Sequence, residues 1–150
     1  MTPEQIDQLI NTHFQYEATD NVDGVVSSLT EDAEHHVVPS PFGPIRGRDA
    51  ARNFYSRLFR SLAGEKITPV RRLYAPDFVV DEVIWEGQVS DGSIFLCDGA
   101  SGRVSFRMLH VFELEGDQIR SEQVWCDLAA IQQQLGIRPV ATSETAETVA

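Results

Sequence analysis

The order in which two hydrophobic periodicities follow one another restricts the fold of this chain more than any other feature. Residues 3–29 and 48–62 carry apolar positions at helical spacing, with one short strand-like run at 33–38 between them, whereas residues 67–128 consist mainly of runs with the composition of strands. Helices that precede a series of consecutive strands are typical of an α+β fold in which one sheet curls around the helices. A parallel Rossmann-type sheet would alternate strands and helices, so the order argues against it.

Local signals set the boundaries of the expected elements. Thr2, Pro3 and Gln5 form a capping-box start for a first helix. Gly64 stands where a C-terminal cap of the third helix belongs. We expect helices over 3–20, 22–29 and 48–62, strands over 33–38, 67–74, 78–88, 104–115 and 118–128, and a terminal helical segment over 128–135.

The length and composition suit one domain. A chain of 150 residues with 42% hydrophobic residues can bury a single core. We place this domain at residues 1–136. The segment 137–150 is rich in Ala, Thr, Ser and Glu without periodicity, so we expect a disordered C-terminal tail.

The charge balance argues against two classes of partner. Twelve basic and 23 acidic residues give a net charge of −11, which repels nucleic acid and anionic membranes. No apolar run approaches the roughly 20 residues that span a bilayer, and the first residues lack a secretory signal, so we expect a cytoplasmic protein. Cys97 and Cys126 show no metal or disulfide spacing and are expected to be packing residues.

The last hairpin predicts which side chains face inward. If Gly116 and Asp117 form a two-residue turn, the paired positions sum to 233, and alternation then defines two faces. The expected inner face carries Phe106, Met108, His110, Phe112, Gln123, Trp125 and Asp127. The opposite face, which includes Leu109, Val111, Glu122, Val124 and Cys126, is also substantially apolar. A sheet with an apolar outer face predicts a homodimer that forms through this face.

Asp127 is the main candidate for chemistry. By this register its carboxylate lies at the floor of the sheet among aromatic side chains, where desolvation raises the pKa of an acid and suits it to act as a general acid/base. Asp is also a favoured N-cap residue, so Asp127 could instead cap the segment 128–135. The residues leave both roles open.

The histidines supply two further candidates. His35 and His36 point to opposite faces of their strand, and His35 is the one we expect inside. His110 is inward by the register above and could hydrogen-bond Gln123 or a substrate oxygen, or be a satisfied core residue. Glu31, Glu34 and His36 could bind a metal, but solvated polar residues at the start of a strand explain them better, and no metal site is predicted.

Many aromatic residues in one small domain predict an apolar pocket for a small molecule. Plain core packing is the alternative interpretation for each of them. The expected pocket-lining residues are Tyr16, Phe42, Phe54, Val83, Trp85, Phe106, Met108, Gln123 and Trp125.

Three short motifs carry a resemblance to a known family. They are Gly43 to Ala50, which reads Gly-Pro-Ile-Arg-Gly-Arg-Asp-Ala where the family has Pro-x-Gly-x-Arg-Asp-Ala, Glu115 to Ile119, and Trp125-Cys126-Asp127. With them the chain resembles the SnoaL-like branch of the nuclear transport factor 2-like superfamily over nearly all of residues 1–136. The resemblance implies an α+β cone with N-terminal helices packed in a curved, mostly antiparallel sheet. It also implies polyketide-cyclase chemistry that needs no cofactor, with an acid/base aspartate at the position of Asp127.

Two other branches of the superfamily are similar in part. Limonene epoxide hydrolases resemble the chain over the same stretch, but their Arg and second Asp correspond to Val83 and Trp85. The resemblance therefore argues against epoxide hydrolysis by their mechanism. Ketosteroid isomerases and scytalone-type dehydratases share the cone, and a pair such as His35 with Asp127 would suit isomerisation or dehydration.

These observations predict a lyase, isomerase or cyclase that acts without a cofactor on a small apolar carbonyl compound, polyketide-like or steroid-like. In it Asp127 moves a proton and His35 or His110 polarises the carbonyl oxygen. The alternative is a non-catalytic module of the same fold that binds a small apolar ligand or serves as a dimeric interaction domain.

Overall fold

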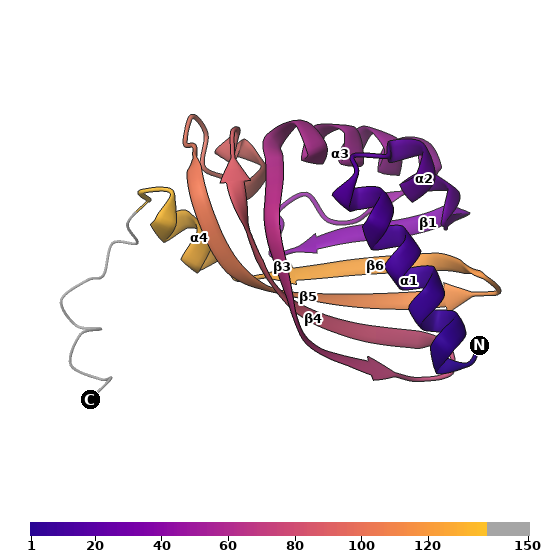
Figure 1. Cartoon of the computed structure of the whole chain (residues 1–150). Coiled ribbons are helices and arrows are strands. Elements are labelled where there is room, and N and C mark those ends of the chain that lie inside the picture. The colour runs from indigo at the N-terminus through magenta and orange to yellow at the C-terminus, as the bar shows by residue number, and fades with distance from the viewer. Residues whose placement is uncertain (138–150) are drawn as a thin grey trace.

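The computed structural model describes residues 1–137 of the chain, and the predicted disordered tail lies outside these residues apart from Ile137. Within the described part, six strands form one curved sheet in the order β2-β1-β6-β5-β4-β3. The predicted α+β architecture is confirmed (Figure 1). The elements are α1 (Pro3–Ala18), α2 (Val22–Ser27), β1 (Leu29–Val38), β2 (Ile45–Arg46), α3 (Arg48–Ser61), β3 (Leu62–Tyr74), β4 (Phe78–Val89), the 3₁₀ turn η1 (Gly92–Phe95), β5 (Gly102–Glu115), β6 (Gln118–Cys126) and α4 (Leu128–Gln134).

The helices form where the sequence supplies caps and an apolar face. Thr2 caps α1 through a full capping box, since its hydroxyl accepts from the Gln5 amide and the Gln5 side chain accepts from the Thr2 amide. Figure 1 shows α1 and α3 on one side of the curved sheet. The buried faces of both helices pack with the sheet in a core that includes Ile6, Ile10, Ala51, Tyr55 and Phe112.

The sheet is longer than predicted at two places. Strand β1 begins at Leu29, where we expected the end of a helix, and β3 begins at Leu62, directly after α3. Gly64 is therefore not a helix cap but a residue of β3, where it pairs with Gly87. The ring of Trp85 lies against both glycines. A Cβ on Gly87 would come within 2.6 Å of this ring, so the close approach requires glycine.

One β-bulge in the last hairpin decides which residues face the helices. Next to the turn, Leu114 pairs with Ile119, as the predicted register requires. Beyond it Glu113 pairs with Ser121, so Arg120 is an extra residue in β6. A one-residue insertion turns every following side chain to the other face of the sheet.

The predicted faces of β6 are consequently wrong, whereas those of β5 are correct. Glu122, Val124 and Cys126 lie opposite Phe112, His110 and Met108 on the inner face. Gln123 and Trp125 lie on the outer face, where 48% of Trp125 is exposed. Because of the bulge, Glu122 lies in the interior, where the predicted register had placed Gln123 and Trp125.

No helix among residues 1–137 combines the length and the apolar composition that a membrane span requires.

Candidate functional site

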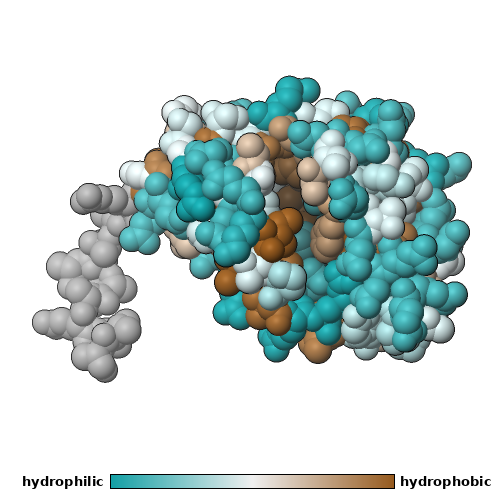
Figure 2. Space-filling model, viewed as in Figure 1, coloured by the Kyte–Doolittle hydropathy of each residue, from teal (hydrophilic) through white to brown (hydrophobic). Residues whose placement is uncertain are grey.

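A cavity of about 1100 Å³ lies between the inner face of the sheet and the helices α1 and α3. Figure 2 shows apolar side chains gathered in a hollow near the middle of the molecular surface. Of the predicted pocket residues, the structure places six in the cavity wall: Phe42, Phe54, Val83, Trp85, Phe106 and Met108. Gln123 and Trp125 face outward because of the bulge, and Tyr16 packs on the core, with its ring against Gly24.

A carboxylate that the sequence analysis placed outside lies at the polar end of this cavity. Glu122 is 1% exposed, and its Oε2 accepts a 2.6 Å hydrogen bond from the hydroxyl of Tyr55. Two histidines face the same oxygen, with Nε2 of His13 at 3.4 Å and Nε2 of His35 at 3.9 Å. Strands β1 and β6 and helices α1 and α3 each contribute one of these four side chains.

His13 is the positively charged member of this cluster. Its Nδ1 lies 2.7 Å from the Ser28 hydroxyl, which itself donates to the carbonyl of Val25, so Nδ1 must carry a proton. Its Nε2 lies between carboxylate oxygens of Glu17 and Glu122, at 3.2 and 3.4 Å, without an aligned hydrogen bond to either. Burial opposes the charge, but the two carboxylates outweigh it and raise the pKa of His13 to about 10.

Glu122 is correspondingly held in its ionised form. Burial alone would raise its pKa, but the nearby positive charge of His13 outweighs burial and holds the pKa of Glu122 well below its ordinary value. Burial and the negative charge of Glu122 raise the pKa of Tyr55, which therefore stays protonated and donates. Glu122 and Tyr55 thus line the cavity, and His13, which is not part of its wall, supplies the counter-charge.

His35 is the uncharged histidine of the cluster. Burial lowers its pKa below the ordinary value, and this effect exceeds the opposing effect of Glu122. Its ring lies against Phe54, with the ring centroids 4.2 Å apart, and the residue lines the cavity. Among the described residues its ring nitrogens have no hydrogen-bond partner. A neutral imidazole that borders an apolar cavity beside a carboxylate can accept a proton from a bound molecule.

The groups of His13, Glu17 and Glu122 lie within 4.8 Å of one another, a spacing that a metal ion could also bridge. A protonated His13 already supplies the positive charge between the two carboxylates. The residues weighed for a metal in the sequence, Glu31, Glu34 and His36, do not belong to this group.

The prediction that Asp127 faces inward is wrong. Asp127 is exposed and lies outside the cavity, after the last residue of β6. Its carboxylate accepts a 3.0 Å hydrogen bond from the amide of Ala130, which makes it the N-cap of α4. Of the two roles left open by the sequence, the geometry therefore supports the cap.

Replacing Asp127 with Ala removes this cap. We expect the free energy of unfolding to fall by about 0.5–2 kcal/mol, because the first turn of α4 loses one side-chain acceptor. Occupancy of the cavity should be unchanged. Urea unfolding and ligand titration of the two proteins check both statements, and a loss of ligand binding without a loss of stability would contradict the capping role.

His110 lies on the inner face, as predicted, but without the predicted partner. Gln123 faces outward, so it is not the hydrogen-bond partner of His110, which was one of the possibilities that the sequence left open. The imidazole is stacked on Phe112 at 5.5 Å and is 3% exposed. Its Nδ1 is buried and has no hydrogen-bond partner among the described residues.

The two cysteines have packing roles. Cys97 is buried in the second part of the core, next to Phe95 and Val104. Burial raises the pKa of the Cys126 thiol to about 11, so it is not a thiolate nucleophile at neutral pH.

Sequence reasoning missed Glu122 and His13. Neither position carries a motif that would indicate a functional residue. Glu122 lies in a strand, and His13 lies in a helix one turn before Glu17. The available signal was the charged Glu122 on a predicted outer face that is mainly apolar, because a bulge in β6 would turn this residue inward.

Comparison with known proteins places this geometry in context. A family model described as a SnoaL-like domain matches residues 10–122. No curated protein matches the chain. Similar solved structures include a hypothetical protein with a ketosteroid isomerase-like fold from Catenulispora acidiphila, with a TM-score of 0.71 and 18% identity over 92% of this chain and 96% of that one.

Two further structures share the fold. An epoxide hydrolase of M. tuberculosis described as LEH-like has a TM-score of 0.69 and 17% identity, covering 88% of this chain and 90% of its own. A phenazine biosynthesis-related protein of Pseudomonas aeruginosa has a TM-score of 0.73 and 14% identity, covering 98% and 94%. Identities this low show a common fold.

Proposed function

Since the chain belongs to the SnoaL-like domain family, we propose that it is an isomerase, lyase or cyclase that acts on a small apolar carbonyl compound and uses His35 as its general base. The observation that carries the proposal is the neutral imidazole of His35, which borders the cavity 3.9 Å from a buried carboxylate. In this proposal His35 takes the acid/base role that the sequence suggested for Asp127, because Asp127 caps a helix outside the cavity.

The proposed step is a proton transfer. His35 takes a proton from the carbon next to the carbonyl group, and the electron pair of that C–H bond forms the enolate. The enolate then takes the proton back at the same or another carbon, which regenerates neutral His35. The negative charge of Glu122 stabilises the imidazolium that exists between the two transfers.

His35 suits this step better than the carboxylate beside it. The pKa of Glu122 is held far below neutrality, so Glu122 is a weak base at pH 7. Its place is instead that of a positioning residue, which acts through His35. The apolar wall of the cavity excludes water and favours substrates with little charge.

Deuterium exchange tests this proposal without knowledge of the natural substrate. The protein is incubated in D₂O with 1-tetralone or 2-acetylnaphthalene, and proton NMR follows exchange at the carbon next to the carbonyl. We expect exchange above the rate in buffer. A protein that binds the ketones and leaves the exchange rate unchanged would be the non-catalytic module instead.

We also propose that two copies pair through the outer sheet face. Three large apolar side chains on this face are exposed: Leu73 by 53%, Phe78 by 42% and Trp125 by 48%. They lie on β3, β4 and β6, so they extend across the sheet. Monomers rarely expose so wide an apolar face, and a twofold pairing would cover it.

Trp125→Arg tests this pairing. We expect the variant to sediment as a monomer at concentrations where the wild type sediments as a dimer, because two buried guanidinium groups would face one another. Phe42→Arg is the matched control, since Phe42 is 84% exposed but lies in a loop at the cavity. A wild type that sediments as a monomer would contradict the proposal.

A further inference from the structure

Two buried polar atoms in the cavity wall have no partner. They are Oδ2 of Asp81 and Nδ1 of His110, and within residues 1–137 neither has a hydrogen-bond partner. Asp81 is 5% exposed and His110 is 3% exposed, and both line the cavity. An unpartnered buried polar atom costs about 1–3 kcal/mol, so a pair of them in one wall calls for a ligand group that satisfies both.

The sheet register brings these two side chains together. Asp81 of β4 pairs directly with His110 of β5, and both point to the inner face. Directly opposite residues of antiparallel strands have Cβ atoms about 5 Å apart. Phe14 of α1 packs on the imidazole with a centroid distance of 5.0 Å, which limits the access of water from the helix side.

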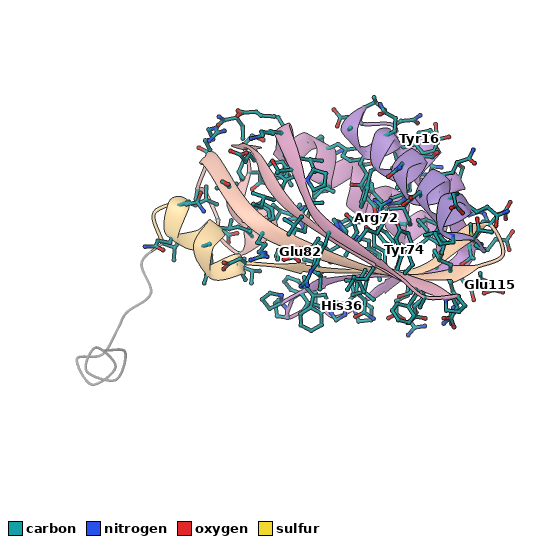
Figure 3. All side chains as sticks on the ribbon, turned by 60° about the horizontal axis from the view of Figure 1, so that its bottom comes forward. Tyr16, His36, Arg72, Tyr74, Glu82 and Glu115 are labelled. Carbon is teal, nitrogen blue, oxygen red and sulfur yellow. The ribbon has the colours of Figure 1, made fainter. Side chains whose placement is uncertain are left out.

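The other oxygen of Asp81 is already engaged. Oδ1 accepts a 2.6 Å hydrogen bond from Nε of Arg72, and Nη1 of Arg72 donates to Asp7 and Asn11 of α1. Tyr74 donates to the same Asp7 carboxylate. Figure 3 shows Arg72 and Tyr74 on the strand β3 that borders this part of the molecule. The carboxylate of Asp81 is therefore held in place through Oδ1 by Arg72, which it shares with Asp7, while Oδ2 is left for a ligand.

We propose that Asp81 and His110 form a subsite that binds a hydroxyl group of the ligand. The hydroxyl donates its proton to Oδ2 of Asp81 and accepts a hydrogen bond from Nδ1–H of His110, which satisfies both atoms. A neutral hydroxyl fits better than an ammonium group, because a hydroxyl can both donate to Asp81 and accept from His110, whereas an ammonium group has no acceptor. The negative carboxylate also disfavours a developing enolate oxygen at this place, which leaves the reacting end of the ligand near His35.

This inference rests on the proposed function, since it describes the substrate of the same cavity. Asp81 lies on β4 and His35 on β1, three strands away, which corresponds to a separation on the order of 14 Å along the sheet. The substrate class is thus an apolar carbonyl compound of at least two fused rings or equivalent length, with a hydroxyl at the end remote from the reacting carbon.

Calorimetric titration with matched naphthalenes tests the subsite. The probes are 2-naphthol, 2-fluoronaphthalene and 2-(aminomethyl)naphthalene, and the proteins are the wild type, Asp81→Leu, His110→Phe and Glu82→Gln. Arg72 keeps Asp7 and Asn11 in Asp81→Leu, and circular dichroism verifies the fold of each variant. Glu82→Gln is the matched control, because Glu82 is the adjacent carboxylate but lies on the outer face with Arg71 and Arg107.

We expect the wild type and Glu82→Gln to bind 2-naphthol about tenfold more tightly than 2-fluoronaphthalene. In Asp81→Leu and His110→Phe this ratio should fall towards one, and if only one of the two variants folds, that variant decides. Equal binding of the two probes by the wild type, a ratio that survives in either variant, or tighter binding of the amine would overturn the proposal. The readout is affinity, so absent ketone exchange with an intact hydroxyl preference would refute His35 catalysis and leave the subsite standing.

Discussion

We expect His35→Gln to exchange the α-proton of a bound ketone about 10² to 10⁴ times more slowly than the wild type, because glutamine fills the space of the imidazole but cannot accept a proton at neutral pH. The affinity for the ketone should change little, since the aromatic wall around the cavity is intact. Rates come from deuterium incorporation at saturating ketone, and affinities come from calorimetry on the same samples.

The adjacent histidine gives a matched control for this variant. His36 follows His35 in β1, lies outside the cavity wall and points to the other face of the sheet (Figure 3). His36→Gln should therefore exchange the ketone at the wild-type rate. Equal losses in both variants would mean that the imidazole of His35 is not the base.

Glu122→Gln should lower the free energy of unfolding by about 3–5 kcal/mol, which is the usual effect of removing one partner from a buried ion pair. The amide keeps the hydrogen bond from Tyr55, but His13 loses its closest fully buried counter-charge. Glu34→Gln is the control, because its partner Arg46 is 73% exposed and such a surface pair contributes about 1 kcal/mol or less. Urea unfolding at pH 7 measures both variants, and equal effects would contradict the buried ion pair.

The pH dependence of the free energy of unfolding tests the ion pair between His13 and Glu122 independently. A histidine with a raised pKa stabilises the fold fully below the ordinary value of 6.5, and this contribution is lost as the pH rises through about 10. The lowered pKa of Glu122 contributes above its ordinary value of 4.5 and is lost in acid. The wild type should therefore lose stability between pH 6.5 and 10, and Glu122→Gln should show a smaller loss over this range.

The helices and strands were predictable because their signals are local. Capping at Thr2 and the alternation of residues in β4 and β5 depend on near neighbours, and the structure keeps these elements within a few residues of the expected bounds. The start of β3 was harder to predict, because a glycine such as Gly64 is typical of a helix cap. In the fold Gly64 belongs to the sheet, where it leaves room for Trp85.

The candidate site was only half predictable, and the reason is a single residue. Both the pairing of β5 with β6 and the faces of β5 follow from the turn at Gly116, but the bulge at Arg120 depends on how the two strands twist around the core. One extra residue moves Asp127 out and Glu122 in. His35 and His110 kept their predicted faces because β1 pairs regularly with β6 from Glu34 onward and β5 alternates regularly on the other side of the bulged strand.

The contact between His13 and Glu122 could not be predicted from the sequence and is seen only in the folded structure. The two residues are more than a hundred positions apart, and His13 lies on a helical face that reads as core. Its spacing from Ile6 and Ile10 is that of a buried helical face but gives no indication of charge. The charge follows only from the carboxylates of Glu17 and Glu122 that surround it in the fold.

The protonation states of the two histidines test the central claim most directly. Nitrogen-15 NMR of the imidazole rings across pH 5 to 10 resolves His13 and His35, assigned with His13→Gln and His35→Gln. The structure predicts an imidazolium at His13 that persists up to about pH 10 and a neutral ring at His35 throughout the neutral range. A His35 that remains protonated at pH 7, or a His13 that is neutral there, would contradict the assignment of His35 as the base beside a buried ion pair.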